Sequence, residues 1–321
     1  LEEAYRAAHA AVVVVDHGAR GLLLLSGQSR LDLLHRMSTQ ALTGLKPGQG
    51  AATVLTTEIG RIIDRLIVYA GDDYALLLTG EGHAEALARY LRRNIFFNDD
   101  AQVADLSGQM ALLGVYGPRA AERLSAGWPD AAGLPLHHWR PPADAPGQAA
   151  TIMARLQHTL YRADPLAGDG YYVMAAADRV DSLLSRLGRP TPDAPFIDAT
   201  AYDYLRIETG QPRFGRELTL DYIPLEAGLW DDVSFHKGCY TGQEIIARME
   251  SRGKLAKRLA RLRPAAPVAA GAEIAANGRP VGTLTSAADG PAGPLAQGYV
   301  KTAVLDEAAP LTANGVPLSL V

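Results

Sequence analysis

The stretch "AATVLTTEIGRIIDRLIVYAGDDYALLLTG" (residues 51–80) carries a pattern from which the fold of this chain can be predicted. Its two apolar runs are separated by "GDD" (71–73), which predicts two strands joined by a hairpin with a glycine-containing loop. The segment 81–93 follows with apolar residues at helical spacing and predicts a helix. Before the hairpin, "GLLLLSGQSRLDLLHRM" (21–37) has an apolar strand pattern, a glycine and a second helical pattern. These segments predict one unit that combines strands and helices.

The same order of elements returns later in the chain. "MALLGVYGPRAAERLSA" (110–126) reads as a strand followed by a helix with Pro118 at its first position. "YYVMAAA" (171–177) and "DRVDSLLSRLG" (178–188) are a further strand and helix. Strand–helix–strand passages that occur twice are typical of the split β-α-β pattern of ferredoxin-like units.

The last part of the chain has a different pattern. From about Leu259, short strand-like pieces alternate with Gly, Pro and Asn, and "AANGRPVG" (275–282) holds an Asn-Gly hairpin turn. This pattern predicts a small β-barrel or sandwich. We therefore predict an α+β fold with two ferredoxin-like units and a C-terminal β-barrel. The expected domains are 1–105, 106–258 and 259–321.

Composition narrows the class of protein. The 321 residues include 31 basic and 35 acidic side chains, for a net charge of −4, and 48% are apolar. This balance does not suggest a protein built as a whole to bind nucleic acid or membranes. No apolar run approaches the ~20 residues of a membrane span, so we expect a cytoplasmic protein without a membrane partner. The single cysteine excludes an internal disulfide and a four-cysteine metal site, so we expect no metal bound by one chain.

That single cysteine, Cys239, lies in "FHKGCYTGQEIIARMESRG" (235–253). A helix is predicted to begin near Gly242, and the unpaired amides of a helix start favour negative charge. With Lys237 nearby, we expect a thiol more acidic than a free cysteine, whose pKa is about 8.5. A thiolate of this kind is a nucleophile, a redox site or a soft-metal ligand. The alternative is a small, inert residue that only packs.

A basic run follows the cysteine. It is either a solvated face or an anion site for a polyglutamate tail, a phosphate or RNA. The run lacks the interleaved aromatic residues that single-stranded nucleic acid requires, so nucleic acid is expected at most as a weak partner at 248–263. Its seven basic side chains are Arg248, Arg252, Lys254, Lys257, Arg258, Arg261 and Arg263.

"KGCYTGQE" (237–244) resembles the signature of YgfZ-type folate-binding proteins, which are relatives of the aminomethyltransferase (T-protein) of the glycine cleavage system. The segments 45–69, 205–218 and 278–287 resemble other parts of the same proteins, in the right order. The resemblance implies a ring-like molecule in which two ferredoxin-like units and a β-barrel surround a central channel. That channel is expected to hold tetrahydrofolate as cofactor.

Three positions depart from the transferase branch. That branch carries two adjacent acids before its "LIVY"-like strand and uses the second in catalysis, whereas this chain has Asp64 followed by Arg65. The glutamate that binds the pterin is matched here by Tyr172, and a folate-contacting arginine by Tyr202. Replacing a required carboxylate by a cation is expected to abolish the transfer chemistry. Aminomethyl transfer is therefore kept only as the alternative activity.

The resemblance also assigns the reactive site. Cys239 is the expected essential thiolate, and Lys237 is expected to lower its pKa or to bind an anionic group. Gly238 permits the turn that positions the thiol. The other signature residues are expected to orient the site, cap the helix or simply pack: Tyr240, Gly242, Gln243, Glu244, Arg248 and Arg252.

Four further residues are candidates for folate binding. Tyr69 and Leu24 occupy positions that resemble contacts of the transferase branch, although Leu24 is equally typical of an ordinary core. Asp64 and Glu226 are polar candidates for the same region. Asp64 lies in an otherwise apolar strand, where an unpaired buried carboxylate is costly.

The function expected from the resemblance is tetrahydrofolate binding in support of assembly or repair of iron–sulfur clusters in other enzymes. Its partners are then folate and iron–sulfur client or assembly proteins. A different class stays open, in which the chain is a non-catalytic folate sensor or an accessory of tRNA modification that docks through the basic run.

Overall fold

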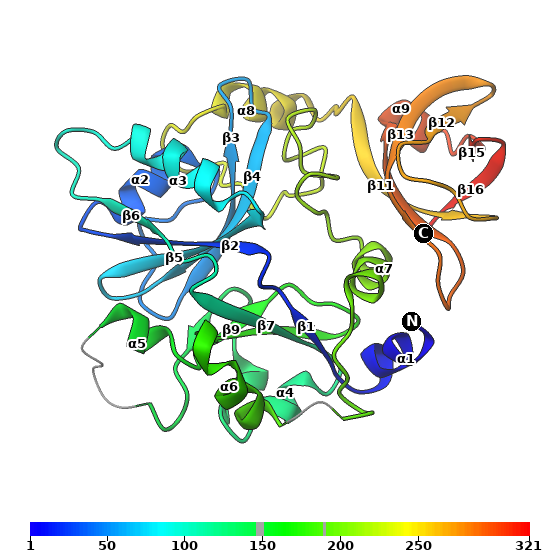
Figure 1. Ribbon diagram of the computed structural model, residues 1–321. Helices are drawn as coiled ribbons and strands as arrows, with labels where there is room; N and C mark the ends of the chain where they lie inside the picture. The colour runs from blue at the N-terminus through cyan, green and yellow to red at the C-terminus, as the bar shows by residue number, and fades with distance from the viewer. Residues whose placement is uncertain (146–150, 189–190) are drawn as a thin grey trace.

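The computed structural model describes residues 1–145, 151–188 and 191–321, and Figure 1 shows its arrangement. In the described part, two antiparallel five-stranded sheets lie next to each other, and a closed barrel stands beside them. These features confirm the predicted α+β fold with a C-terminal barrel.

The first sheet has the strand order β3-β4-β5-β2-β6. The order β6-β2-β5-β4, with α2 and α3 as the connecting helices, is that of a ferredoxin-like unit, and β3 extends it at one edge. Leu23 and Leu25 of β2 face the helices and Leu22 faces the other sheet, because side chains alternate along a strand. The strands are β2 (Arg20–Ser26), β3 (Gly50–Thr56), β4 (Ile62–Ala70), β5 (Tyr74–Glu81) and β6 (Gln102–Asp105).

The second sheet has the order β1-β7-β10-β9-β8. Its outer strand β1 precedes the whole first sheet in the sequence, yet it pairs with β7. The first expected domain, 1–105, therefore contains a strand of the second sheet, since the fourth strand position of this unit is filled from the N-terminal segment. The strands are β1 (Val13–Asp16), β7 (Met110–Gly117), β8 (Trp139–Arg140), β9 (Leu160–Ala163) and β10 (Asp169–Ala176).

The barrel closes in the order β11-β14-β13-β12-β15-β16. The Asn-Gly pair at Asn277 and Gly278 forms the β12–β13 turn, and both residues have positive φ, as hairpin turns of this type need. The strands are β11 (Lys257–Pro264), β12 (Glu273–Ala276), β13 (Arg279–Ala288), β14 (Leu295–Lys301), β15 (Leu311–Ala313) and β16 (Val316–Leu320).

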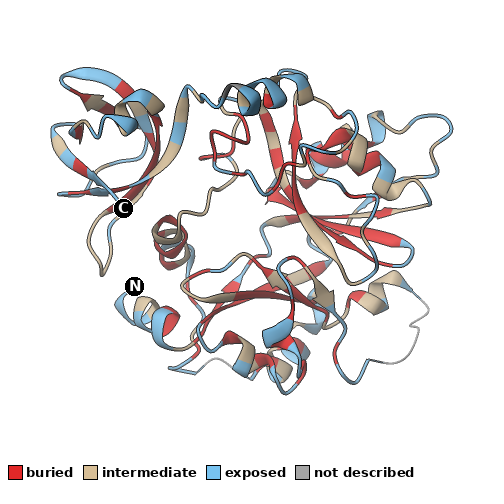
Figure 2. Ribbon diagram, turned by 180° about the vertical axis from the view of Figure 1, so that it is seen from behind, coloured by how far each residue is buried: buried red, intermediate tan, exposed pale blue. Residues whose placement is uncertain are grey.

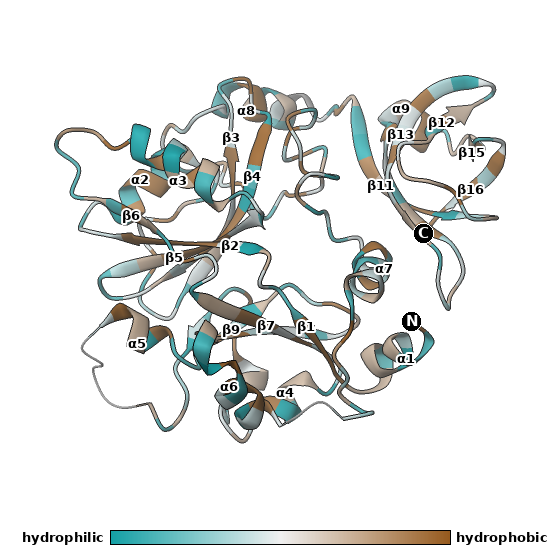
Figure 3. Cartoon of the chain, viewed as in Figure 1, coloured by the Kyte–Doolittle hydropathy of each residue, from teal (hydrophilic) through white to brown (hydrophobic). Residues whose placement is uncertain are grey.

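Helices cover the outer face of each sheet, and the inner faces pack on each other. Figure 2 shows the strands of both sheets largely buried, and Figure 3 shows hydrophobic strands against a hydrophilic α3. Helix α7 lies between the second sheet and the barrel (Figure 1). The helices are α1 (Glu2–Ala10), α2 (Arg30–Met37), α3 (Ala84–Arg93), α4 (Ala120–Leu124), α5 (Ile152–Leu156), α6 (Val180–Leu187), α7 (Ala199–Thr209), α8 (Gln243–Arg252) and α9 (Thr302–Asp306), with 3-10 turns at Ala131–Gly133 and Ala177–Arg179.

Candidate functional site

A cavity of about 510 Å³ lies where the two sheets, α7 and the segment 209–214 meet. Side chains from widely separated parts of the sequence line it. The three positions that depart from the transferase pattern, Arg65, Tyr172 and Tyr202, are all among them. This convergence makes the cavity the first candidate site.

Arg65 is fixed from both sides by carboxylates. Its Nε donates to Asp232 Oδ2 at 2.6 Å, and its Nη1 donates to Asp164 Oδ2 at 2.7 Å. Burial alone would raise the pKa of Asp164, but the charge and hydrogen bonds of Arg65 more than reverse this and lower it to about 2. Arg65 is therefore a locked cation, with neither an acidic nor a basic function at neutral pH.

Asp64 points to the opposite face of β4 from Arg65. It is fully buried, and its Oδ2 accepts hydrogen bonds from the Gly80 amide at 2.9 Å and pairs with His83 Nδ1 at 3.0 Å. Its Oδ1 has no hydrogen-bond partner among the described residues. Phe214, which also lines the cavity, stacks on the His83 ring with centroids 4.4 Å apart. The residue that the sequence singled out as an unusual buried acid thus keeps one free acceptor atom.

Arg20 and several aromatic rings form the wall on the side of the second sheet. Arg20 Nη1 donates to the Tyr172 hydroxyl at 2.7 Å. His17 Nε2 lies 2.8 Å from the Tyr116 hydroxyl, and burial, with help from the charge of Arg20, lowers the pKa of His17 to about 3. The imidazole is therefore neutral at physiological pH. Arg20 and His17 were not anticipated from the sequence, because nothing in "DHGARG" marks two residues that meet rings from β7, β10 and α7.

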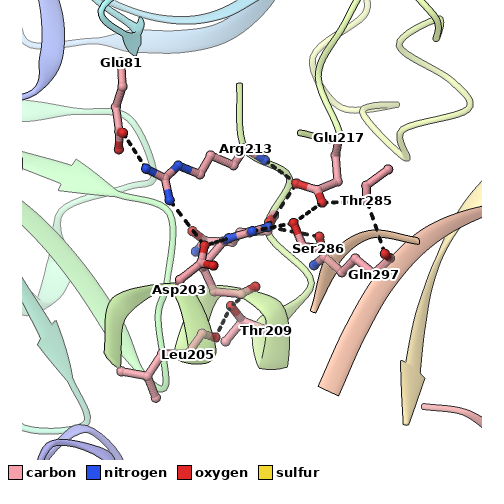
Figure 4. Close-up of polar contacts among 11 residues, drawn as sticks. Glu81, Asp203, Leu205, Thr209, Arg213, Glu217, Thr285, Ser286 and Gln297 are labelled. Carbon is pink, nitrogen blue, oxygen red and sulfur yellow. Dashed lines mark hydrogen bonds and ion pairs between the residues drawn. The ribbon is translucent and has the colours of Figure 1, made fainter. Parts of the chain in front are cut away.

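A buried ionic network ties the cavity wall to the barrel. Arg206 of α7 donates to Glu217 Oε2 at 2.9 Å, and Glu217 also accepts from the hydroxyls of Thr285 at 2.7 Å and Ser286 at 2.6 Å. Figure 4 shows Glu217 pointing toward these two barrel residues. Arg213 links the same network to Glu81 at the end of β5. The network fixes α7 and the segment after it against β5 and the barrel.

The folate candidates named from the sequence do not all reach this cavity. Asp64 lines it. Tyr69 is buried in the core between the sheets, and its hydroxyl has no partner among the described residues. Leu24 packs against the same core. Glu226 is not among the lining residues. It lies near the start of the barrel, where its carbonyl accepts from the Leu259 amide, and burial raises the pKa of its carboxyl group.

Cys239 lies in a second region, the loop 230–242, and it is exposed. Lys237 of this loop is bound to the end of α2. Its ammonium group donates to the backbone carbonyls of His35, Ser38 and Gln40, where α2 ends, and these three bonds use its three donors. Burial lowers the pKa of Lys237 to about 8. Lys237 therefore anchors the loop to the first sheet unit.

Two other signature residues, Tyr240 and Gly242, have clear structural environments. Tyr240 is 8% exposed and packs with Ile223, Val233 and Ile246. Helix α8 begins after Gly242, as predicted. Gly242 has φ +84°, and a Cβ there would lie 2.5 Å from the Thr57 carbonyl oxygen, so only glycine fits. The signature residues outside this packing are Gly238, Glu244 and Arg248, which are exposed, Gln243, which is half-buried, and Arg252, whose side chain lies outside the described residues.

Asp232 connects the two regions. It belongs to the loop 230–242, its carboxylate holds Arg65 in the cavity, and its backbone carbonyl accepts from Thr39 Oγ1 at 2.6 Å. None of the cavity-lining residues belongs to the loop itself. The loop that carries the thiol is thus linked to the cavity by the Asp232–Arg65 ion pair, but it contributes no residue to the cavity lining.

Several side chains of the basic run have partners within the chain. Arg258 pairs with Asp306 at 2.6 Å, and Lys257 lies 4.3 Å above the Tyr222 ring. Arg261 and Arg263 donate to backbone carbonyls of Glu208 and Ala292. Arg248 and Lys254 are exposed.

Two further observations concern the described residues only. No helix there combines the length and apolar character needed to cross a membrane. No group of three or more His, Cys, Asp or Glu side chains gathers there in a way that would hold a metal ion.

Comparison with known proteins shows which family models and which relatives the chain matches. Residues 1–237 match the family model of the GCVT N-terminal domain, and residues 257–321 match that of the CAF17 C-terminal beta-barrel domain. An Arabidopsis thaliana protein named "Putative transferase At1g60990, chloroplastic" is 31% identical over 310 residues, which cover 94% of this chain and 68% of that protein. The aminomethyltransferase of Bacillus subtilis (strain 168) is 26% identical over 298 residues, covering 91% of this chain and 79% of the enzyme.

The fold has a solved counterpart as well. The crystal structure of glycine cleavage system aminomethyltransferase T from Bartonella henselae has a TM-score of 0.83 at 24% identity, over 99% of this chain and 87% of that one. The chain therefore belongs to the YgfZ/CAF17 family of aminomethyltransferase-like proteins, with a GCVT-like region followed by a CAF17-type barrel.

Proposed function

We propose that the central cavity binds a reduced folate, tetrahydrofolate or a derivative, and that the bound chain supports assembly or repair of iron–sulfur clusters in other enzymes. The folate half is supported by an aromatic-walled cavity of about 510 Å³, a size typical of small-molecule sites. It is also supported by the aminomethyltransferases among the relatives.

The observation that carries the proposal is the state of Arg65. The resemblance puts a catalytic acid at this position, and the arginine here is held by Asp164 and Asp232. The two carboxylates raise its pKa further above the usual value, against the effect of burial. A group that neither accepts nor releases a proton cannot assist transfer to or from the folate amine. The cavity is thus suited to binding a folate without transferring its one-carbon unit.

The iron–sulfur half rests on Cys239. Its exposure leaves the sulfur open to a large partner, and a cluster on a client enzyme would reach it without entering the cavity. One cysteine per chain supplies one ligand, so a cluster would be shared with the client, a second copy or a small thiol. We place the thiol as the contact to the client and the folate cavity as a separate site.

Titration calorimetry with tetrahydrofolate tests the folate half. Wild type and Cys239→Ala are expected to bind equally, because the thiol lies outside the cavity. Tyr202→Ala removes an aromatic wall and is expected to bind about fivefold more weakly or worse, since an aromatic contact typically contributes about 1 kcal/mol. Tyr222→Ala, which removes a tyrosine outside the cavity, is the matched control. Failure of wild type to bind would end the folate assignment.

Repair of an oxygen-damaged 4Fe–4S dehydratase tests the other half. Recovery of dehydratase activity with iron, sulfide and a thiol reductant is expected to be faster with wild type than with Cys239→Ser. Arg89→Met, a change at an exposed arginine of α3 outside the signature, is expected to behave as wild type. Equal recovery with wild type and Cys239→Ser would show that the thiol is not required.

Aminomethyl transfer is the second candidate, favoured by the names of several relatives. Wild type is expected to produce no methylenetetrahydrofolate from an aminomethylated lipoyl carrier protein. Arg65→Asp restores the pair of adjacent acids and is the variant most able to show activity. Turnover by wild type would overturn our preference for binding without transfer.

A further inference from the structure

Four arginines line the central cavity, and three of them are neutralised in the same way. Arg65 is held by Asp164 and Asp232. Arg206 is held by Asp203 and Glu217, and Arg213 by Glu81 and Asp203, in the network of Figure 4. Arg20 is the exception, because it forms no ion pair with any residue that the structure describes. Among the four arginines, it is therefore the one that no carboxylate of the described residues holds in an ion pair.

Arg20 has donors to spare. Its Nη1 donates to the Tyr172 hydroxyl at 2.7 Å and its Nε to the Thr79 carbonyl at 3.4 Å. A guanidinium has five N–H groups, so most of them have no acceptor among the described residues. Arg20 lines the cavity beside Tyr202 and His17. The neutral His17 ring adds no second positive charge beside Arg20.

Asp64 supplies the opposite kind of free group in the same cavity. Its Oδ1 is buried and without a partner, while its Oδ2 accepts from the Gly80 amide at 2.9 Å. The Thr79 carbonyl and the Gly80 amide belong to one planar peptide unit. Arg20 and Asp64 therefore bind opposite edges of a single rigid peptide, which keeps the cation and the carboxylate apart and holds both in place. The peptide lies at an irregularity of the β2–β5 pairing, between the pairs Leu22–Leu78 and Arg20–Glu81.

The neighbouring rings limit the shape of the ligand. Tyr172, Tyr202 and Phe214 line the cavity around the two charged groups. Flat aromatic walls favour a planar ring system. A ligand that satisfies both free groups must offer an acceptor oxygen to Arg20 and an N–H donor to Asp64. A pyrimidinone ring, with a ring carbonyl and ring N–H groups, has this combination.

We propose that Arg20 is the residue that determines ligand specificity, donating to the 4-oxo group of a reduced pterin while Asp64 Oδ1 accepts an N–H of the same ring. This inference rests on the folate binding proposed above. It assigns Arg20 a role in choosing between oxo- and amino-substituted rings. A 4-amino group presents donors to the guanidinium in place of an acceptor, and the more basic diamino ring also brings positive charge toward Arg20.

The test compares two ligands on matched proteins by titration calorimetry. The ligands are tetrahydrofolate and tetrahydroaminopterin, which differ by oxo or amino at position 4. Wild type is expected to prefer tetrahydrofolate. Arg20→Met is expected to weaken tetrahydrofolate binding about tenfold to hundredfold, as loss of a hydrogen bond from a charged donor does. The same change is expected to leave the 4-amino ligand as tightly bound or to bind it more tightly, so the preference disappears.

Two further variants keep the test decisive. Arg20→Lys retains the charge, so it is expected to keep part of the preference for the oxo ligand. Arg93→Met removes an exposed arginine of α3 and is expected to match wild type with both ligands.

The outcomes separate the two proposals. Equal weakening of both ligands by Arg20→Met would make Arg20 a purely structural residue, and a wild type without preference for the oxo ligand would overturn the inference even if Arg20→Met did not fold. Absence of binding of both ligands to wild type would instead reject the proposed folate function.

Discussion

The central cavity and the Cys239 loop are built in opposite ways. The cavity draws its walls from both sheets, α7 and the segment 209–214, and its arginines are mostly held by paired carboxylates. The loop 230–242 is one contiguous stretch, and its cysteine is exposed. A ligand in the cavity meets groups that are fixed before it arrives, which favours selective binding of a small molecule. The thiol instead faces solvent, where only a partner that approaches from outside can use it.

Side chains at both ends of the loop attach it to the first sheet unit. The Asp232 carboxylate reaches from the loop to Arg65 in the cavity at 2.6 Å. Lys237 fastens the other end of the loop to the end of α2. If the two regions are separate sites on one scaffold, variants in one should leave the readout of the other unchanged. The following predictions test that separation.

The largest effect is expected from Glu217→Ala. The change leaves Arg206, which is 1% exposed, with a single carboxylate partner, and it removes the acceptor of two barrel hydroxyls. Removing one partner of a buried pair typically costs about 3–5 kcal/mol of unfolding free energy. Denaturant unfolding measures the loss, with the exposed Glu85→Ala as control. The reactivity of the Cys239 thiol in the native protein is expected to stay the same, and a large change in it would contradict the separation.

The next effect is expected from Arg65→Met, which leaves the carboxylates of Asp164 and Asp232 without their cation. In wild type the folded pKa of Asp164 is lowered from 3.8 to about 2. A lowered folded pKa contributes stability that is present above pH 3.8 and is lost as the pH falls toward 2, a total of about 2 kcal/mol. We expect Arg65→Met to lose at least this amount at neutral pH, because burial then raises the pKa of Asp164.

Unfolding curves of both proteins between pH 2 and pH 7 check this prediction. The acid-dependent part of the wild-type curve is expected to be smaller in Arg65→Met. An unchanged pH profile would mean that Arg65 does not set the ionisation of Asp164.

These two predictions rest on contacts that the sequence did not disclose. The strand and helix patterns predicted the two units and the barrel, because local periodicity and turn residues determine them. Asp64 stood out for the same reason, as an acid inside an apolar strand. The pairing of Arg65 with Asp164 and Asp232 was not visible, since these residues lie 99 and 167 positions away along the chain. Arg20 was missed for the same reason, whereas Cys239 could be proposed from the sequence because its whole signature is contiguous.

A smaller effect is expected from Lys237→Met. The variant leaves three carbonyls at the end of α2 without their donor, at a cost of about 1–3 kcal/mol. The loop 230–242 is expected to become more sensitive to limited proteolysis, while Lys254→Met, a change at an exposed lysine, is expected to have no effect. Tetrahydrofolate affinity is expected to remain that of wild type, and its loss would show that the loop helps to form the cavity.

The smallest expected effect concerns the thiol itself. The rate of Cys239 alkylation by iodoacetamide, followed by mass spectrometry, is expected to be the same within about twofold with and without saturating tetrahydrofolate, because a difference of RT ln 2 is below the energy of a single contact. Cys239 is exposed and the cavity is lined by other segments, so a ligand in the cavity does not cover the sulfur.

A route for a larger effect is the ion pair between Arg65 and Asp232. A tenfold change in alkylation rate on folate binding would show that the cavity and the Cys239 loop are not independent. If Arg65→Met then removed that change, the ion pair would be the element that couples the cavity to the thiol. If the change persisted in Arg65→Met, the contacts of Lys237 with the end of α2 would be the next candidate for the coupling. Lys237→Met would then be expected to abolish the change.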